Sequence, residues 1–147
     1  MIPLFLDITG AFSPEMEMKN ILIVDDNKDI LDALSGGLCH CLKDCGILTA
    51  SSGARGKDIM NSTPIDLVLT ELTMPTMNGY RLIEQVRKNH PTVPVCVMTG
   101  DCSPAVIERL KTMGVGRWIK KPFQFDKLAK MISDELKLEN RNSRQVE

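Results

Sequence analysis

Acidic, hydroxyl and basic side chains follow the apolar segments of this sequence, and such side chains bind metal ions and phosphate groups. In chain order they are Asp25 and Asp26 after residues 21–24, Glu71 after 66–69, Thr99 after 93–98, and Lys121 after 118–119. Three carboxylates brought close together cannot all stay ionised unless a cation joins them. Mg²⁺ takes such oxygen ligands, and a lysine adds a further positive charge. A metal ion and an ammonium around one carboxylate are typical of a site for phosphoryl transfer.

Each of these features also has a plain structural explanation. The pair Asp25-Asp26 can cap a helix N-terminus, with Asp29 in the first turn. Lys121-Pro122 can open a helix, and Thr99-Gly100 and residues 74–79 can be ordinary turns and loops. The conjunction of suitable residues after four separate segments favours a site over these explanations.

The elements that must position these residues alternate along the chain. Apolar, β-rich runs occupy residues 21–24, 46–50, 66–69, 93–98 and 118–119. Helical periodicity lies between and after them, marked by Ile30, Leu34, Leu38 and Leu42, by residues 55–61, by Tyr80, Ile83 and Val86, by 105–113 after Ser103-Pro104, and by Leu128, Met131, Ile132, Leu136 and Leu138. Continuous apolar runs are typical of parallel strands buried on both faces. We therefore predict an α/β doubly wound sheet with right-handed crossovers. In the strand order 2-1-3-4-5, the first and third strands are neighbours, and the site lies at the carboxyl ends of the strands.

Composition excludes several classes of function. The chain has 147 residues, of which 43% are hydrophobic and 25% charged, as expected for one globular domain. A net charge of −1 and only 4% aromatic residues argue against nucleic acid as a partner, and the apolar runs are too short to span a membrane. The five cysteines have no disulfide spacing and no export signal precedes them, so we expect reduced thiols and a cytoplasmic location. Cys41 and Cys45 would share a helix face, and we expect the thiols around them to be buried or half-buried.

The domain boundaries are predicted from the same patterns. Residues 1–18 form an N-terminal extension that we expect to be disordered, with a docking arm as the alternative. Residues 19–139 form the domain, and 140–147 a polar C-terminal tail, which leaves no room for an output domain after it.

Several motifs of the sequence resemble those of a known family. They are Ile21-Leu22-Ile23-Val24-Asp25-Asp26-Asn27, the segment 66–79 (DLVLTELTMPTMNG), Thr99-Gly100 and Lys121-Pro122-Phe123. Over residues 19–139 the chain resembles a CheY-like receiver domain of the response regulators in two-component signalling. The resemblance implies a flavodoxin-like (βα)5 fold with five parallel strands. It also implies a Mg²⁺ site formed by Asp25, Asp26, Glu71 and the backbone carbonyl of Thr73, and a switch pair formed by Thr99 and Trp118.

The chain departs from this family at the residue that would accept a phosphoryl group. Receivers carry aspartate where this chain has Glu71, and the frame is fixed by Pro75 and Gly79, four and eight residues later. One extra methylene displaces the carboxylate by roughly 1.5 Å, and a misplacement of about 1 Å can slow a reaction on the order of 10²-fold. The longer carboxylate is expected to reach toward Lys121 or Thr99 and to mimic a phosphoryl group in part.

Three hypotheses for the function follow. The chain is a stand-alone receiver module in phosphorelay signalling that works without phosphorylation, or a Mg²⁺-dependent receiver still phosphorylated on Glu71, or a decayed receiver that serves as a dimerisation or scaffold domain. None is an enzyme beyond receiver-type autophosphorylation and dephosphorylation. The expected partners are a histidine kinase, a phosphotransfer domain, a separate effector, or a second copy bound through the fourth helix, fifth strand and fifth helix. A nucleotide or flavin binder is disfavoured because the first loop, residues 25–29, is acidic.

Overall fold

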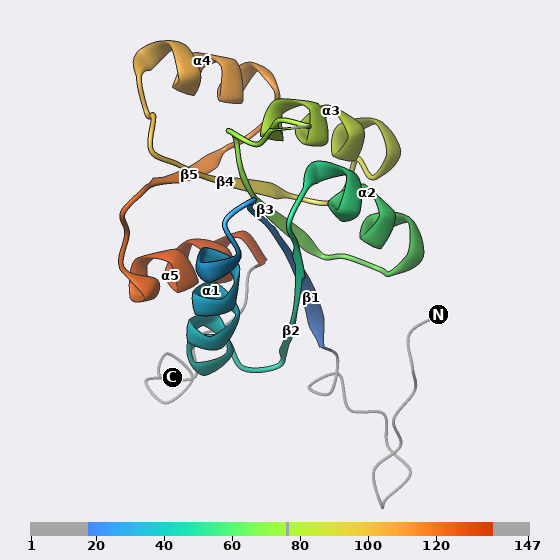
Figure 1. Cartoon of the computed structure of the whole chain (residues 1–147), viewed down its shortest axis with the longest axis vertical. Coiled ribbons are helices and arrows are strands. Elements are labelled where there is room, and N and C mark those ends of the chain that lie inside the picture. Colours follow the sequence, from blue (N-terminus) through green and yellow to red (C-terminus); the bar gives the residue numbers. More distant parts are fainter. Residues whose placement is uncertain (1–17, 76, 137–147) are drawn as a thin grey trace, which may run out of the picture.

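Five β-strands and five α-helices alternate along residues 18–75 and 77–136, the part of the chain that the computed structural model describes (Figure 1). The strands are β1 Lys19–Val24, β2 Cys45–Ala50, β3 Leu67–Glu71, β4 Val95–Thr99 and β5 Arg117–Lys120. The helices are α1 Lys28–Cys41, α2 Gly53–Ser62, α3 Gly79–Asn89, α4 Pro104–Thr112 and α5 Phe125–Leu136. Of the predicted extension over residues 1–18, only Met18 is among the described residues, and the predicted domain boundary at residue 139 and the predicted tail over 140–147 lie outside them.

All five strands pair in parallel, in the order β2-β1-β3-β4-β5. The predicted fold class and strand order are therefore confirmed. The register aligns Val24 of β1 with Thr70 of β3, and Glu71 with Met98 of β4. Thr99 in turn pairs with Lys120 of β5. Because the strands are parallel and aligned, the residues that end them meet at one edge of the sheet.

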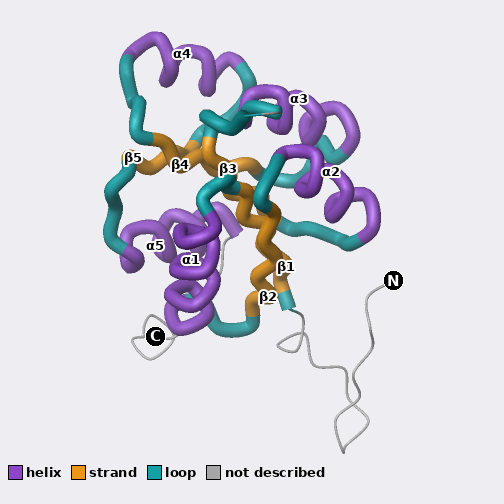
Figure 2. The backbone as a smooth tube through the Cα atoms, viewed as in Figure 1, coloured by secondary structure: helices purple, strands orange, loops and turns teal. Residues whose placement is uncertain are grey.

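Helices cover both faces of the sheet (Figures 1 and 2). Helices α1 and α5 pack on one face, and α2, α3 and α4 pack on the other. Alternate side chains of each central strand enter the two clusters, as Ile21 and Ile23 do on the first face and Leu22 and Val24 on the second. Burial on both faces is the physical reason that the strands appear in the sequence as unbroken apolar runs.

The polar ends of the strands differ from the sequence prediction. Strand β3 begins at Leu67 and continues through Thr70 and Glu71, both of which are buried. Asp66 precedes the strand, and its carboxylate accepts the backbone N–H of Asn20 at 2.8 Å. This contact lies at the opposite end of the strands from Glu71.

Two of the cysteines are less buried than predicted, whereas Cys45 is half-buried as expected. Helix α1 ends at Cys41, and Cys45 begins β2, so the two do not share a helix face. A tight turn separates them, in which Asp44 adopts a positive φ of 63°. The thiols of Cys39 and Cys41 are exposed, which contradicts the expectation of burial, whereas Cys96 is buried within β4. In the described residues, no helix has the length and the apolar character needed to cross a membrane.

Candidate functional site

Asp25 lies directly after β1 and is 1% exposed. Its backbone N–H donates to the carbonyl of Ala50 at 3.1 Å, which extends the pairing of β1 with β2 to this residue. Its carboxylate oxygen Oδ1 accepts the backbone N–H of Asn27 at 2.9 Å. The second oxygen, Oδ2, lies 2.7 Å from the Nζ atom of Lys121. Both oxygens of this buried carboxylate therefore have a partner.

The N-cap of α1 is Asn27 rather than the acidic pair before it. The Asn27 side-chain oxygen accepts the backbone N–H groups of Asp29 at 3.0 Å and Ile30 at 3.2 Å. The helix-capping explanation of Asp25 and Asp26 is therefore wrong, since an amide fills that role. Asn27 is itself among the preferred capping residues, a signal in the sequence that could have assigned the role to it.

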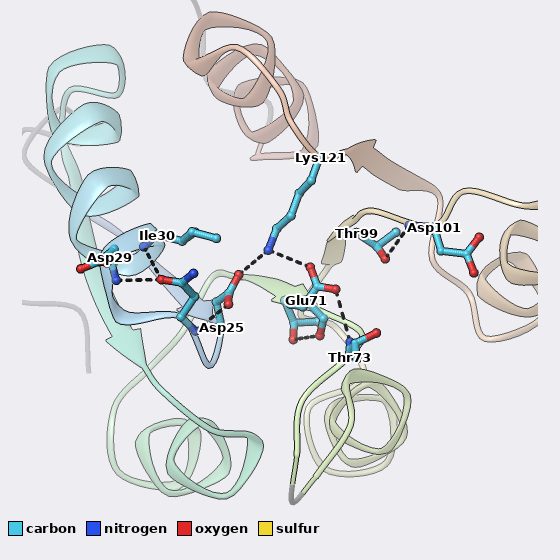
Figure 3. A network of polar contacts seen from close by, with 10 residues as sticks. Asp25, Asp29, Ile30, Glu71, Thr73, Thr99, Asp101 and Lys121 are labelled. Atoms are coloured by element: carbon cyan, nitrogen blue, oxygen red, sulfur yellow. Dashed lines mark hydrogen bonds and ion pairs between the residues drawn. The ribbon is translucent and has the colours of Figure 1, made fainter.

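Asp26 is exposed, although it was predicted to be a metal ligand beside its neighbour. Asp25, by contrast, is buried and contacts Lys121 in the network drawn in Figure 3.

Glu71 ends β3 and is 7% exposed. Its oxygen Oε1 accepts the backbone N–H of Thr73 at 3.3 Å, so the carboxylate folds back over the loop that follows the strand. Its oxygen Oε2 lies 2.9 Å from Lys121 Nζ. No well-directed hydrogen bond from the described residues reaches Oε2, and its stabilisation is therefore the charge of the ammonium. The prediction that Glu71 reaches Lys121 is confirmed.

The loop after Glu71 is held by Gly79, whose backbone N–H donates to the carbonyl of Leu72 at 2.7 Å. A Cβ atom at residue 79 would overlap the carbonyl oxygen of Glu71 and lie 2.7 Å from Leu72 Cα. Only glycine permits this close approach. A similar approach occurs at Gly53, where a Cβ atom would lie 2.8 Å from the Met77 sulfur. We did not predict these packing roles from the sequence.

Lys121 brings the two buried carboxylates together (Figure 3). It follows β5 and its backbone N–H donates to the carbonyl of Thr99 at 2.9 Å. The Lys121-Pro122 peptide bond is cis. Partial burial by itself lowers the pKa of the ammonium, but its contacts with Asp25 and Glu71 outweigh this effect and raise the pKa above the ordinary 10.5. We call the contacts of Lys121 with Asp25 and Glu71 the bridge. The Lys121 side chain is 23% exposed, so solvent partly screens the charges of this bridge.

The two predicted switch residues lie outside this bridge. Thr99 is 2% exposed, and its hydroxyl oxygen accepts the backbone N–H of Asp101 at 3.3 Å. The Asp101 carboxylate accepts the backbone N–H of Ser103 at 3.0 Å, and this bond holds the pKa of Asp101 below its usual range. Trp118 pairs with Val97 and is half-buried against the cluster beneath α2, α3 and α4. Thr99 thus bonds within its own loop, and the other predicted contact of Glu71, with Thr99, is not among the hydrogen bonds of the described residues.

The predicted Mg²⁺ ligands do not fit a metal ion in this arrangement. Across residues 18–75 and 77–136, no three His, Cys, Asp or Glu side chains are placed to hold one together. An ammonium stands where Asp25 and Glu71 approach each other, and Asp26 is exposed. For Thr73, the structure shows its N–H bonded to Glu71, whereas the prediction concerned its carbonyl.

Comparison with known proteins decides the family. Residues 21–133 match the family model of the response regulator receiver domain. The chain belongs to this family. The match covers the receiver domain from β1 to α5, including every residue of the bridge described above.

The curated relatives of this receiver domain are longer proteins. The chain is 32% identical over 117 residues to the transcriptional regulatory protein GlrR of Escherichia coli strain K12, a match covering 80% of this chain and 26% of GlrR. It is 30% identical over 116 residues to the sensor histidine kinase RcsC of Salmonella typhi, covering 77% of this chain and 12% of RcsC. The chain thus spans only a minor part of the length of these relatives.

Solved receiver structures resemble this receiver domain over most of its length. The CheY-like receiver domain protein of Methanospirillum hungatei JF-1 superposes with a TM-score of 0.77 at 26% identity, covering 82% of this chain and 95% of that protein. The chemotaxis protein CheY4 of Vibrio cholerae gives a TM-score of 0.74 at 25% identity, covering 80% and 98%. These similarities support a signalling module rather than a metabolic enzyme.

Proposed function

We propose that this receiver domain transmits signals through protein contact without phosphorylation of residue 71, and that Glu71 imitates a phosphoryl group in part. The observation that carries the proposal is the 2.9 Å contact between Glu71 Oε2 and Lys121 Nζ. The glutamate places a permanent negative charge against the lysine, with no need for a phosphoryl donor.

The imitation extends to the lysine but not to the threonine. The Thr99 hydroxyl bonds to Asp101 in its own loop, rather than turning toward Glu71. A carboxylate also carries less charge and fewer acceptor oxygens than a phosphoryl group. We therefore expect a partial bias toward the active state.

The partner surface that we propose consists of α4, β5 and α5. Helix α4 buries one residue fully, Leu110. It is also linked to α3 by the Arg109 guanidinium, whose carbon lies 3.7 Å from the centroid of the Tyr80 ring. Such a cation–π contact contributes about 0.5–1 kcal/mol at an exposed site. A helix held by so few buried groups can adjust its position at low energetic cost. This supports α4 as the part of the surface that changes.

The partners that we propose are a histidine kinase, a phosphotransfer domain, a separate effector, or a second copy of this chain, in a cytoplasmic phosphorelay. The second copy is the simplest to test. Sedimentation equilibrium of the natural protein and of Glu71→Gln compares self-association with and without the charge. If Glu71 biases this surface toward dimerisation, Glu71→Gln raises the dimer dissociation constant, and identical constants would remove the link between Glu71 and self-association.

Intact-mass spectrometry after incubation with acetyl phosphate and Mg²⁺ tests phosphorylation directly. The natural protein is expected to gain no phosphoryl group, whereas Glu71→Asp is expected to gain one, because aspartate restores the length of the accepting carboxylate. Transfer would join phosphorus to the carboxylate oxygen and release acetate. Glu71→Gln, which has no carboxylate, is the matched control for modification elsewhere.

Each pattern of modification selects one hypothesis. A phosphoryl group that maps to Glu71 in the natural protein overturns the proposal and supports a receiver with an unusual acceptor. Modification of Glu71→Asp alone supports it. If neither protein is modified, the surrounding residues no longer serve phosphoryl transfer, and the scaffold hypothesis replaces the proposal.

A further inference from the structure

Helix α1 carries two exposed cysteines near its end, and they lie on different flanks of the helix. Figure 1 shows α1 between α5 on one side and β2 on the other. Gly37 faces α5, because a Cβ atom added there would lie 2.9 Å from a ring carbon of Phe125. An α-helix turns through roughly 100° per residue. Cys39 therefore lies about 200° round the helix from Gly37, on the β2 flank, whereas Cys41 lies about 40° from Gly37, on the α5 flank.

A third cysteine, Cys45, lies beside the β2 flank of α1. It begins β2, and its half-buried side chain packs against the cluster beneath α1 and α5. Only residues 42–44 separate the end of α1 from Cys45. Burial raises the pKa of the Cys45 thiol most, nearby acidic residues raise it further, and a negative charge on Cys39 adds to the effect. Since such an effect weakens with distance, the charge agrees with the helix geometry in making Cys39 and Cys45 neighbours.

The two neighbouring thiols differ in their access to solvent. Cys39 is exposed, so its thiolate is open to attack a disulfide in solution. Cys45 is half-buried, which shields it from molecules in solution but not from Cys39. An accessible thiol beside a second, resolving thiol is typical of cysteines that respond to oxidation. Among the side chains that the structure describes, no three metal-binding groups are placed to hold an ion, so the chemistry open to this pair is that of two thiols.

We infer that Cys39 and Cys45 form a redox-sensitive pair, which a low-molecular-weight disulfide such as glutathione disulfide converts into a disulfide bond within the chain. The Cys39 thiolate attacks one sulfur of glutathione disulfide, which forms a mixed disulfide and releases one glutathione thiolate. The Cys45 thiol then gives its proton to solvent, attacks the Cys39 sulfur and releases the second glutathione. The two protein thiols lose two electrons, and glutathione disulfide is reduced to two thiols.

The bond would tie the end of α1 to the edge strand of the sheet. A disulfide requires two Cα atoms about 4.4–6.8 Å apart, and the last turn of α1 can adjust to this distance because helix ends fray. Cys45 pairs with Lys19 at the start of β1, so the cysteines lie at the opposite end of the strands from Glu71. The inference therefore concerns a second place in the molecule and goes beyond the proposed function.

Peptide mapping of the full chain tests the inference. The reduced protein is incubated with millimolar glutathione disulfide at pH 8, its remaining thiols are alkylated, and the monomer is digested with trypsin without reduction. Cleavage separates peptide 29–43, which contains Cys39 and Cys41, from peptide 44–55, which contains Cys45. The natural protein is expected to yield these two peptides joined by a disulfide, and dithiothreitol is expected to separate them.

Cys41→Ser is the matched control, because Cys41 is exposed like Cys39 but lies on the α5 flank. Cys41→Ser is expected to keep the joined peptides and Cys39→Ser to lose them, and circular dichroism checks that both remain folded. Cys45→Ser is expected to retain glutathione on Cys39, because the resolving thiol is absent. Equal joining in Cys39→Ser and Cys41→Ser would overturn the inference. So would a natural protein that carries glutathione on Cys39 without joined peptides, or joined peptides that occur only in a covalent dimer.

Discussion

Loss of the Lys121 charge is expected to be the most damaging single change to the site. Lys121→Met leaves Asp25 and Glu71 buried side by side with no cation, and breaking a buried pair in this way typically costs about 3–5 kcal/mol. Because the lysine side chain is 23% exposed, solvent offsets part of the loss. We therefore expect the free energy of unfolding to fall by about 3 kcal/mol, at the lower end of that range.

The contribution of the Lys121–Glu71 contact can be separated by a double-mutant cycle with Lys121→Met and Glu71→Gln. At the observed 2.9 Å, Coulomb's law gives about 1.4 kcal/mol in water and about 5.7 kcal/mol at an effective dielectric constant of 20. Partial exposure of the lysine places the expected coupling nearer the first value, at about 2 kcal/mol. The contact of Lys121 with Asp25 is lost in both lysine variants and cancels in the cycle.

Urea unfolding followed by circular dichroism measures the four free energies, provided that all four proteins unfold in two states with equal dependence on urea. A second pair in the same domain supplies the control. Arg117 Nε lies 2.6 Å from Glu135 Oε2, but these side chains are 41% and 29% exposed. Exposed pairs contribute about 0.2–1 kcal/mol, so the corresponding cycle should give a coupling of about 0.5 kcal/mol. A Lys121–Glu71 coupling no larger than that of Arg117 and Glu135 would refute the view that burial gives the site pair its strength.

Other features give further expectations. In urea unfolding, Gly79→Ala should lose about 2–3 kcal/mol of stability because the added Cβ has no room. Gly36→Ala in α1 should gain about 0.5–1 kcal/mol, because its Cβ meets nothing within 4 Å. Equal effects of the two substitutions would contradict the packing argument. Because the pKa of Lys121 is raised in the folded protein, the stability lost in Lys121→Met should be constant up to about pH 10 and shrink at higher pH, as urea melts across pH would show. Burial raises the pKa of Cys96 to about 12, so a thiol reagent at pH 8 should label exposed Cys39 and spare Cys96, with peptide mass mapping as the readout; equal labelling would refute its burial.

The sequence predicted the sheet well because both faces of each central strand are buried. Burial of Leu22 and Val24 on one face and of Ile21 and Ile23 on the other leaves no polar position to interrupt the pattern. The order of the strands came from the family resemblance and from the convergence of polar residues at one end. Periodicity alone does not distinguish one strand order from another.

The sequence predicted which residues form the site better than it predicted the contacts between them. The reach of Glu71 to Lys121 follows from the length of its side chain. The contact of Lys121 with both carboxylates depends on side-chain directions. The burial of Asp25, but not of Asp26, depends on them as well. Asp25 is buried and Asp26 is exposed, and the sequence alone gives no means of telling these neighbouring aspartates apart. The backbone bond from Thr73 depends on the path of the loop, which sequence patterns do not specify.

The cysteine prediction failed for a different physical reason. Continuing the helical period past Cys41 placed Cys45 on the same face. The chain instead reverses at Asp44, whose positive φ of 63° ends any helical continuation. Asp tolerates this conformation better than most residues. The sequence indicated the turn only weakly, because neither Asp44 nor the two residues before it is a glycine or a proline.

The bridge also bears on the order in which the chain assembles, because Lys121 and Asp25 are 96 residues apart in sequence. Pairing of β1 with β3 sets Asp25 and Glu71 side by side and requires only the first half of the chain. Until β5 docks, the two acids repel each other, and the ammonium that balances them is absent. The final strand therefore brings charge neutralisation as well as apolar surface, and the site is complete only when the N-terminal and C-terminal parts of the domain have met. A contact of such long sequence separation is expected to form late in folding, so the bridge marks the completed fold.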